Sequence, residues 1–179
     1  MSRVLIMATN GFEQSELTGP RERLEQAGIE TRVASPERGE IRGWQDKDWG
    51  EAVTVDLSLD KIDVGDYDAL LLPGGQMNPD ILRMDDRAIG VVNDFAEADK
   101  IIAAICHAPW LLAEAGLLEG RIVTSWPSIR TDLINAGADV VDRDVVEDGN
   151  LITSRKPDDV PAFSEALIAR LRLEQSEAA

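Results

Sequence analysis

Short apolar runs recur along the chain, and most of them lack a regular alternation of apolar and polar positions. Runs of this kind are typical of strands whose two faces are both covered, as in the parallel sheets of α/β proteins. Glycine, proline or asparagine bounds several of these runs, which indicates turns at their ends. The pattern predicts strands over residues 3–9, 30–35, 66–73, 101–105 and 121–125.

The segments between these runs carry apolar residues at the three- and four-residue spacing of one helix face. In the first such segment, Leu17, Leu24 and Ala27 share a face. Gly28 supplies its C-terminal stop, and Pro20 is expected to weaken or kink its front. Similar patterns predict helices over residues 86–98, 109–115, 129–135 and 160–173.

Strands that alternate with helices predict an α/β fold, a doubly wound, mostly parallel sheet with helices on both faces. We expect residues 1–179 to form a single domain. Asp148-Gly149 lies between apolar segments and predicts a small β-hairpin within residues 140–153. Residues 37–51 are polar and rich in glycine, with two tryptophans embedded, and are read as a long loop or a β-excursion. That segment could carry function or form a packing or subunit contact.

The composition narrows the range of partners. The net charge is −16, from 34 acidic and 18 basic residues, which opposes binding to nucleic acid and otherwise favours solubility. A single cysteine excludes an intrachain disulfide framework and most cysteine-based metal sites, and fits a reducing, cytoplasmic setting. No apolar run approaches the ~18 residues of a membrane span. Neither phosphate-binding glycine motif is present, so we expect no nucleotide cofactor and no metal.

Cys106 and His107 are the only cysteine and the only histidine of the chain, and they are adjacent. They follow a predicted strand and precede a predicted helix, which is the arrangement of a nucleophile elbow. We expect the N-terminus of the helix to lower the pKa of the thiol and so favour the nucleophilic thiolate. The alternative is that Cys106 is a small buried apolar residue.

His107 could serve as a general acid or base, although adjacency in sequence does not establish contact with the thiol. The alternative is a histidine that is packed or hydrogen-bonded beside the strand end. Gly74-Gly75 follows another predicted strand, and its N–H groups could form an oxyanion hole together with that of His107. The carboxyl ends of parallel strands are where ligands bind in such sheets, so these groups are expected to converge. A glycine pair is otherwise simply a turn.

Glu13 and Glu16 follow the first strand at a spacing that lets them share a helix face. A carboxylate at this turn could form a hydrogen bond with the thiol. The alternative is that both acids only complement the helix dipole.

Five segments of the chain together resemble the PfpI family of the class I glutamine amidotransferase-like superfamily. They are GFEQSEL, LLLPGG, AICHAPWLLAEAG, TSWPSIRTDLINAGA and VVEDGNLITSR, and they cover nearly the whole chain in order. The resemblance implies a flavodoxin-like fold. It also implies that Cys106 is the nucleophile, that His107 is the neighbouring histidine, and that Glu16 is the acid that contacts the cysteine.

The same resemblance assigns further positions. Glu13 matches the second acid of its turn, and Trp126 lies where relatives often carry an aromatic residue near the pocket. In oligomeric proteases of the family, an acid shortly after the double glycine reaches the histidine of a neighbouring subunit. Asp80 is the best match here, on a loop with one extra residue and with an aspartate where glutamate is usual. Ala108 replaces a common glycine of the elbow.

The resemblance implies a cofactor-independent enzyme with a cysteine nucleophile, active as a homodimer or higher homo-oligomer in the cytoplasm. One reading is a stress-protective deglycase or glyoxalase, which acts on α-oxoaldehydes or on their early adducts with proteins. The second reading is an intracellular peptidase that uses the same cysteine on a peptide carbonyl. The alternative from a different class is a non-enzymatic stress protein with a redox-sensing cysteine or a chaperone-like role.

Overall fold

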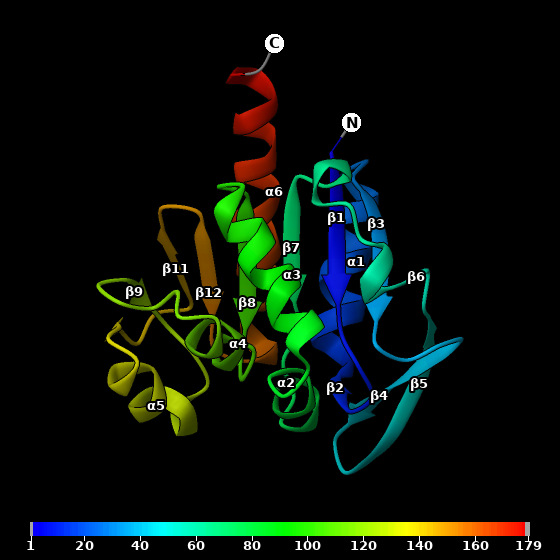
Figure 1. Ribbon diagram of the computed structural model, residues 1–179, viewed down its shortest axis with the longest axis horizontal. Helices are drawn as coiled ribbons and strands as arrows, with labels where there is room; N and C mark the ends of the chain where they lie inside the picture. The colour runs from blue at the N-terminus through cyan, green and yellow to red at the C-terminus, as the bar shows by residue number, and fades with distance from the viewer. Residues whose placement is uncertain (1, 178–179) are drawn as a thin grey trace.

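A computed structural model describes residues 2–177 and contains a central seven-stranded sheet. The strand order is β11-β12-β8-β7-β1-β3-β6 (Figure 1). Every neighbouring pair is parallel except the antiparallel pair of β11 and β12. The strands are β1 (Arg3–Met7), β3 (Glu30–Ser35), β6 (Leu57–Ser58), β7 (Ala69–Leu72), β8 (Ile101–Ile105), β11 (Val145–Asp148) and β12 (Leu151–Ser154).

Helices cover both faces of this sheet, which confirms the predicted doubly wound α/β architecture. In Figure 1, α3 and α4 lie in front of the sheet, and α1 and α6 lie behind it. Residues of β1 alternate between two cores: Leu5 and Met7 pack toward α3 and α4, whereas Val4 and Ile6 pack toward α1 and α6. The helices are α1 (Gln14–Gln26), α2 (Met77–Leu82), α3 (Asp86–Glu97), α4 (Pro109–Glu114), α5 (Arg130–Asn135) and α6 (Val160–Glu177).

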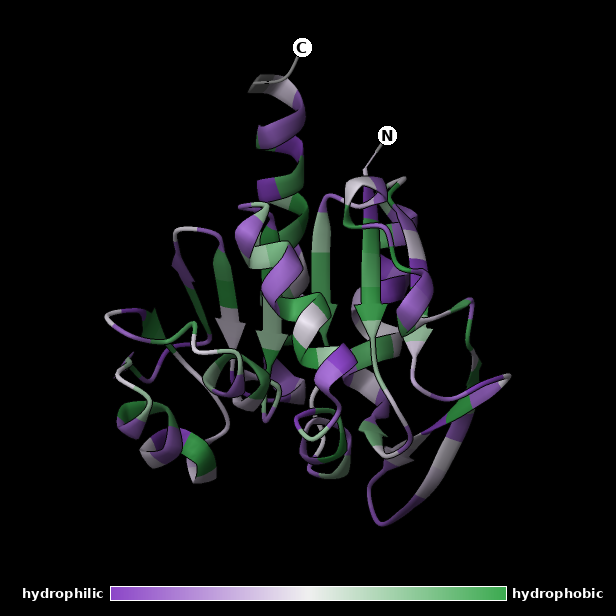
Figure 2. Cartoon of the chain, in the orientation of Figure 1, coloured by the Kyte–Doolittle hydropathy of each residue, from purple (hydrophilic) through white to green (hydrophobic). Residues whose placement is uncertain are grey.

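The central strands therefore need apolar side chains on both sides, and Figure 2 shows β7, β8 and most of β1 in the hydrophobic colour. The predicted strand over residues 30–35 coincides with β3, and the run at 66–73 narrows to β7 because residues 64–66 form a 3-10 turn. Pro20 lies buried inside α1, which continues through it to Gln26. The helix α2 was not predicted, since Pro79 lies inside it and its apolar positions are few.

Residues 37–51 form a β-excursion rather than a loop. β4 (Glu40–Gln45) and β5 (Asp48–Thr54) make a hairpin, and β2 (Phe12–Glu13) pairs with β4 in a separate three-stranded sheet. The rings of Trp44 and Trp49 meet edge to face across the hairpin, with centroids 5.4 Å apart. The hairpin turns at Asp46, whose φ of 56° lies in the left-handed region.

Two predictions near the C-terminal half were wrong in detail. The predicted strand over residues 121–125 is only β9 (Ile122–Val123), which pairs with β10 (Asp139–Val140) outside the main sheet. The predicted hairpin over residues 140–153 is formed by β11 and β12 alone. Asp148 pairs with Leu151, so the two turn residues are Gly149 and Asn150 rather than Asp148 and Gly149. Asp148 stays in its strand because its carboxylate accepts the Ile122 N–H at 2.8 Å.

Among residues 2–177, no helix is both long and apolar enough to cross a membrane. The carboxyl ends of β1, β7 and β8 lie together at one edge of the sheet, where β2, α2 and α4 begin (Figure 1). The glycine pair and the Cys106-His107 pair both lie at this edge.

Candidate active site

Cys106 is the residue at which β8 turns into α4, and its backbone φ is +65°. Only a few non-glycine residues adopt this left-handed conformation, and they cluster at functional sites. The surrounding hydrogen bonds fix it. The Cys106 N–H donates to Ser154 O at 3.0 Å, and the Trp126 N–H donates to Cys106 O at 2.9 Å. The predicted nucleophile elbow is therefore present in the backbone, with a side chain that is 5% exposed.

Glu16 lies in the first turn of α1 and is completely buried. Its Oε2 accepts the Gly74 N–H at 2.9 Å. Its Oε1 is buried without a well-formed hydrogen bond. The Cys106 thiol and the Gly75 N–H are the nearby polar groups, and both favour the ionised carboxylate. Burial, together with the nearby Glu13, raises the pKa of Glu16 to about 8. The carboxyl is thus largely protonated at neutral pH and able to donate a hydrogen bond to the sulfur.

Gly74 allows Glu16 and Cys106 to approach each other. A Cβ on Gly74 would lie 2.4 Å from Glu16 Oε2 and 2.6 Å from Cys106 Cβ, so no larger residue fits. Asn78, a buried residue of α2 that was not predicted, holds this loop. Its Nδ2 donates to Pro73 O at 2.9 Å, and its Oδ1 accepts the Thr9 N–H at 2.7 Å.

The environment of the Cys106 sulfur contradicts the expected effect of the helix. Burial raises the pKa of the thiol, and the Glu16 carboxylate raises it further. The N–H groups of Gly75 and His107 act in the opposite direction. The expectation of a thiol pKa lowered by the helix was wrong, because the sulfur is removed from water and α4 has only six residues. When Glu16 is protonated, its repulsion of the Cys106 thiolate disappears. The ionisation of Cys106 and that of Glu16 are therefore coupled.

The backbone N–H groups of the predicted oxyanion hole have different neighbours. The Gly74 N–H donates to Glu16 Oε2, whereas the N–H groups of Gly75 and His107 face the sulfur, and that of Gly75 also acts on Glu16.

His107 contacts the thiol directly, with 3.2 Å between its Nδ1 and Cys106 Sγ. Its ring is stacked on Trp126, with centroids 5.8 Å apart, and meets the edge of Trp110 at 5.2 Å. Burial between these rings lowers the pKa of His107. The imidazole is therefore neutral at pH 7 and can accept a proton from the thiol.

These side chains open into one cleft of about 360 Å³. Trp126 lines it, as the sequence predicts. Four further residues were not predicted: Trp44, Asp46, Gln76 and Pro157. The complete lining is Glu13, Glu16, Trp44, Asp46, Gly75, Gln76, Cys106, His107, Trp126 and Pro157.

The DJ-1/PfpI family profile matches residues 2–170. The chain belongs to the DJ-1/PfpI family. The resemblance drawn from the five sequence segments is thereby confirmed.

Two curated relatives and one solved structure show the extent of the similarity. The chain is 42% identical to deglycase TK1284 of Thermococcus kodakarensis over 95% of this chain and 99% of that protein. It is 40% identical to the putative cysteine protease YraA of Bacillus subtilis, over 95% and 98%. The crystal structure of Drosophila melanogaster DJ-1beta matches with a TM-score of 0.87 at 30% identity, over 96% of this chain and 91% of that one. The two curated relatives are named as a deglycase and a putative cysteine protease, and the protein is an enzyme of the PfpI type.

Within the family site, Asp80 is the predicted residue that the fold does not bring to the others. It lies exposed on α2 and outside the cleft. No hydrogen bond or ion pair reaches its side chain from residues 2–177.

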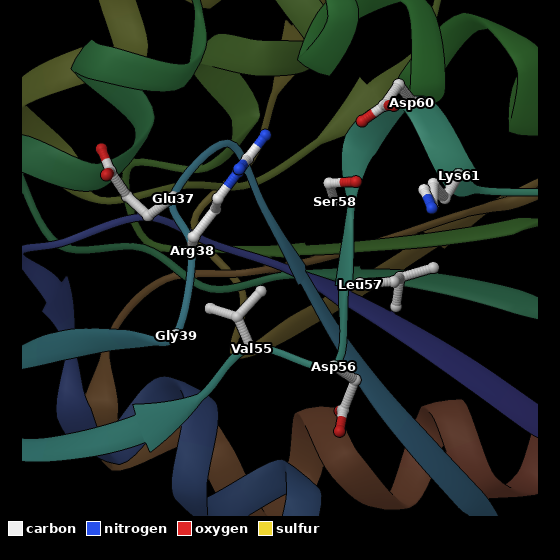
Figure 3. A pocket seen from close by; sticks show the side chains of 9 residues that line it. All are labelled: Glu37, Arg38, Gly39, Val55, Asp56, Leu57, Ser58, Asp60 and Lys61. Carbon is white, nitrogen blue, oxygen red and sulfur yellow. The ribbon is translucent and has the colours of Figure 1, made fainter.

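A larger hollow of about 460 Å³ lies elsewhere, between the segment after β3 and the segment around β6. Figure 3 shows Glu37 and Arg38 on one side of it and Ser58, Asp60 and Lys61 on the other. It shares no residue with the cysteine cleft and contains neither a thiol nor an imidazole. The chemistry of the lining, rather than size, therefore makes the cysteine cleft the candidate active site.

Proposed function

We propose that this enzyme is a cofactor-independent deglycase or glyoxalase, in which Cys106 attacks α-oxoaldehydes or their early protein adducts. The observation that carries the proposal is the set of groups around the sulfur. A neutral imidazole lies 3.2 Å from it, and the N–H groups of Gly75 and His107 face it. A largely protonated Glu16 adjoins it.

The first step forms a bond between Sγ and the aldehyde carbon of the substrate, while His107 takes the thiol proton. The carbonyl electron pair moves to oxygen, where the N–H groups of Gly75 and His107 stabilise the developing charge. His107 then gives the proton to this oxygen, and the product of the step is a hemithioacetal on Cys106. Glu16 holds the sulfur in place during attack.

The remaining steps move one proton and add water. The proton on the former aldehyde carbon is transferred through an enediol to the neighbouring carbon, which leaves a thioester on Cys106. Water then cleaves the thioester and releases a hydroxy acid and the free thiol. For methylglyoxal, the sum is methylglyoxal plus water to lactate, which needs no oxidant or reductant.

The test is the consumption of methylglyoxal by purified protein. We expect the wild type to convert methylglyoxal to lactate and Cys106→Ala to lose this activity completely, because the nucleophile is gone. Thermal unfolding of the variant checks that the fold is intact. Equal conversion by both proteins, or none by either, would reject the proposed action of Cys106 on α-oxoaldehydes.

A second candidate, an intracellular peptidase, is favoured by the direct contact of Cys106 Sγ with His107 Nδ1. A peptide carbonyl needs a base that stays aligned during proton transfer, and a third group usually orients the imidazole. We propose that this group is Asp80 of a neighbouring subunit in a homo-oligomer, as the family resemblance implies.

Side chains around Asp80 support such a contact. Met77, Ile81 and Met84 are apolar and are 36%, 43% and 77% exposed. Exposed apolar side chains that gather on one short helix and its end are typical of a surface that is covered by a partner.

A further inference from the structure

Two carboxyl groups approach the mouth of the cysteine cleft from different elements. Glu13 ends β2 and is half-buried, and Asp46 lies at the turn between β4 and β5. Ser15 Oγ donates to Glu13 Oε1 at 3.3 Å, and no hydrogen bond or ion pair reaches Asp46 from residues 2–177. Burial raises the pKa of Glu13, and Asp46 contributes repulsion to the same shift. The two acids are thus close enough to repel each other and have no cation between them.

No lysine or arginine side chain lines the cleft. An adjoining hollow shares Glu13, Asp46 and Pro157 with it, and this hollow likewise has no basic residue in its lining. The nearest lysines in sequence are Lys47, which is exposed and lines neither hollow, and Lys156, which pairs with Asp158 at 3.4 Å. The ionisable side chains that line the two hollows are therefore acids, apart from Cys106 and His107.

The aromatic residues that line the cleft also favour a cation over an anion. The indole rings of Trp44 and Trp126 both line it. The face of an indole ring attracts a guanidinium or ammonium group, and carboxylates beside such rings strengthen the attraction. An anionic substrate would meet the Glu13 and Asp46 carboxyl groups with no lysine or arginine in the lining to compensate them.

We propose that Asp46 and Glu13 make the entrance to Cys106 selective for carbonyl groups carried on cations. The choice of substrate rests on the proposed function. The favoured substrates are α-oxoaldehyde adducts on arginine or lysine. Neutral thiol adducts and anionic oxo acids are disfavoured. Asp46 and Glu13 act as specificity-determining residues, and neither takes part in bond making.

The charge preference can be measured without any enzymatic activity, because Cys106 is the only cysteine of the chain. The probes are two methanethiosulfonates of similar size, one carrying a trimethylammonium group and the other a sulfonate. Each rate of thiol modification is divided by the rate with free 2-mercaptoethanol, which removes the intrinsic difference in reactivity. We expect the cationic probe to react about fivefold faster or more at low salt, and the preference to shrink as salt rises.

Matched variants assign the preference to its residues. Asp46→Asn keeps a residue that tolerates positive φ, and Glu13→Gln keeps the shape of the side chain. Each should reduce the ratio of the two rates about two- to fivefold. Glu40→Gln removes one charge from an exposed position on the same hairpin, outside the cleft, and should leave the ratio unchanged.

Three results would overturn the proposal. They are equal corrected rates for the two probes in the wild type, a ratio that survives both Asp46→Asn and Glu13→Gln, and failure of both probes to reach Cys106. The substrate arm compares methylglyoxal adducts of N-acetylargininamide and N-acetylcysteinamide, with the arginine adduct expected to be the better substrate. Loss of all turnover with a persisting probe ratio would reject the proposed function but retain the selective entrance.

Discussion

At the scale of single residues, the site depends on a carboxyl group that stays protonated at neutral pH. Glu16 is fully buried, and its one well-formed hydrogen bond comes from the Gly74 N–H. Burial disfavours the carboxylate, which is why the pKa of Glu16 rises to about 8. The proton on Glu16 is what makes it compatible with a developing negative charge on Cys106.

This pKa predicts how stability depends on pH. The folded state keeps the Glu16 proton up to about pH 8, whereas the unfolded chain releases it near the ordinary value of 4.5. The contribution of Glu16 to the free energy of unfolding is therefore complete below pH 4.5. It is lost as the pH rises toward 8, by at most roughly 1.4 kcal/mol per pH unit. We expect Glu16→Gln to remove this decline. The stability of the variant relative to the wild type should therefore increase between pH 6 and pH 8.5.

The measurement is chemical unfolding at several pH values, with Glu22→Gln as the control. Glu22 is exposed on the same helix, and its pH profile should follow that of the wild type. Parallel profiles for Glu16→Gln and the wild type would contradict the buried, protonated carboxyl.

At the scale of elements, three chain segments meet without room for a methyl group. The loop after β7, the start of α1 and the end of β8 converge at Gly74. The added Cβ would also lie 2.7 Å from Ile105 O, which is backbone and cannot give way cheaply.

We therefore expect Gly74→Ala to separate Glu16 from Cys106, to abolish activity and to destabilise the fold by about 1–3 kcal/mol. Gly90→Ala is the matched control, because a Cβ at Gly90 meets no atom within 4 Å. Gly90 lies inside α3, so alanine should stabilise the protein by about 0.5–1 kcal/mol and leave activity intact. Full activity in Gly74→Ala would contradict the close packing.

The hairpin of β4 and β5 shows why elements of mixed pattern are harder to predict. Its strands have an alternating, largely exposed pattern interrupted by glycines, which does not distinguish a loop from a strand. Pairing of β2 with Gly43 and Trp44 decides the outcome, and that contact joins segments about thirty residues apart. The same contact brings Trp44 and Asp46 to the cleft.

At the scale of the whole molecule, the fold does not bring every predicted catalytic residue to the cleft. Asp80 is exposed and does not line the cleft that contains His107, and it lies beside the apolar side chains of Met77, Ile81 and Met84. An oligomer that buries this surface could place Asp80 at the His107 of a neighbour.

Mixed oligomers test this arrangement. We expect Asp80→Asn alone and Cys106→Ala alone to lack peptide hydrolysis, and subunits of the two variants to recover part of it after joint refolding. Recovery requires an intact Cys106 to receive Asp80 from its neighbour. A monomer in light scattering, or unchanged hydrolysis in Asp80→Asn, would remove Asp80 from the mechanism.

The sequence by itself determined the architecture and indicated Cys106 as the candidate nucleophile. Buried strands need continuous apolar runs, and helices need a periodic apolar face. Both elements can therefore be predicted from the local sequence. Cys106, His107, Glu13 and Glu16 were likewise identified from their positions at strand ends and from the family motifs. Only the tertiary structure decided their chemistry. Desolvation by distant segments sets the direction of each pKa shift, and Asn78, Asp46 and Trp44 reach the site through long-range contacts that no local pattern encodes.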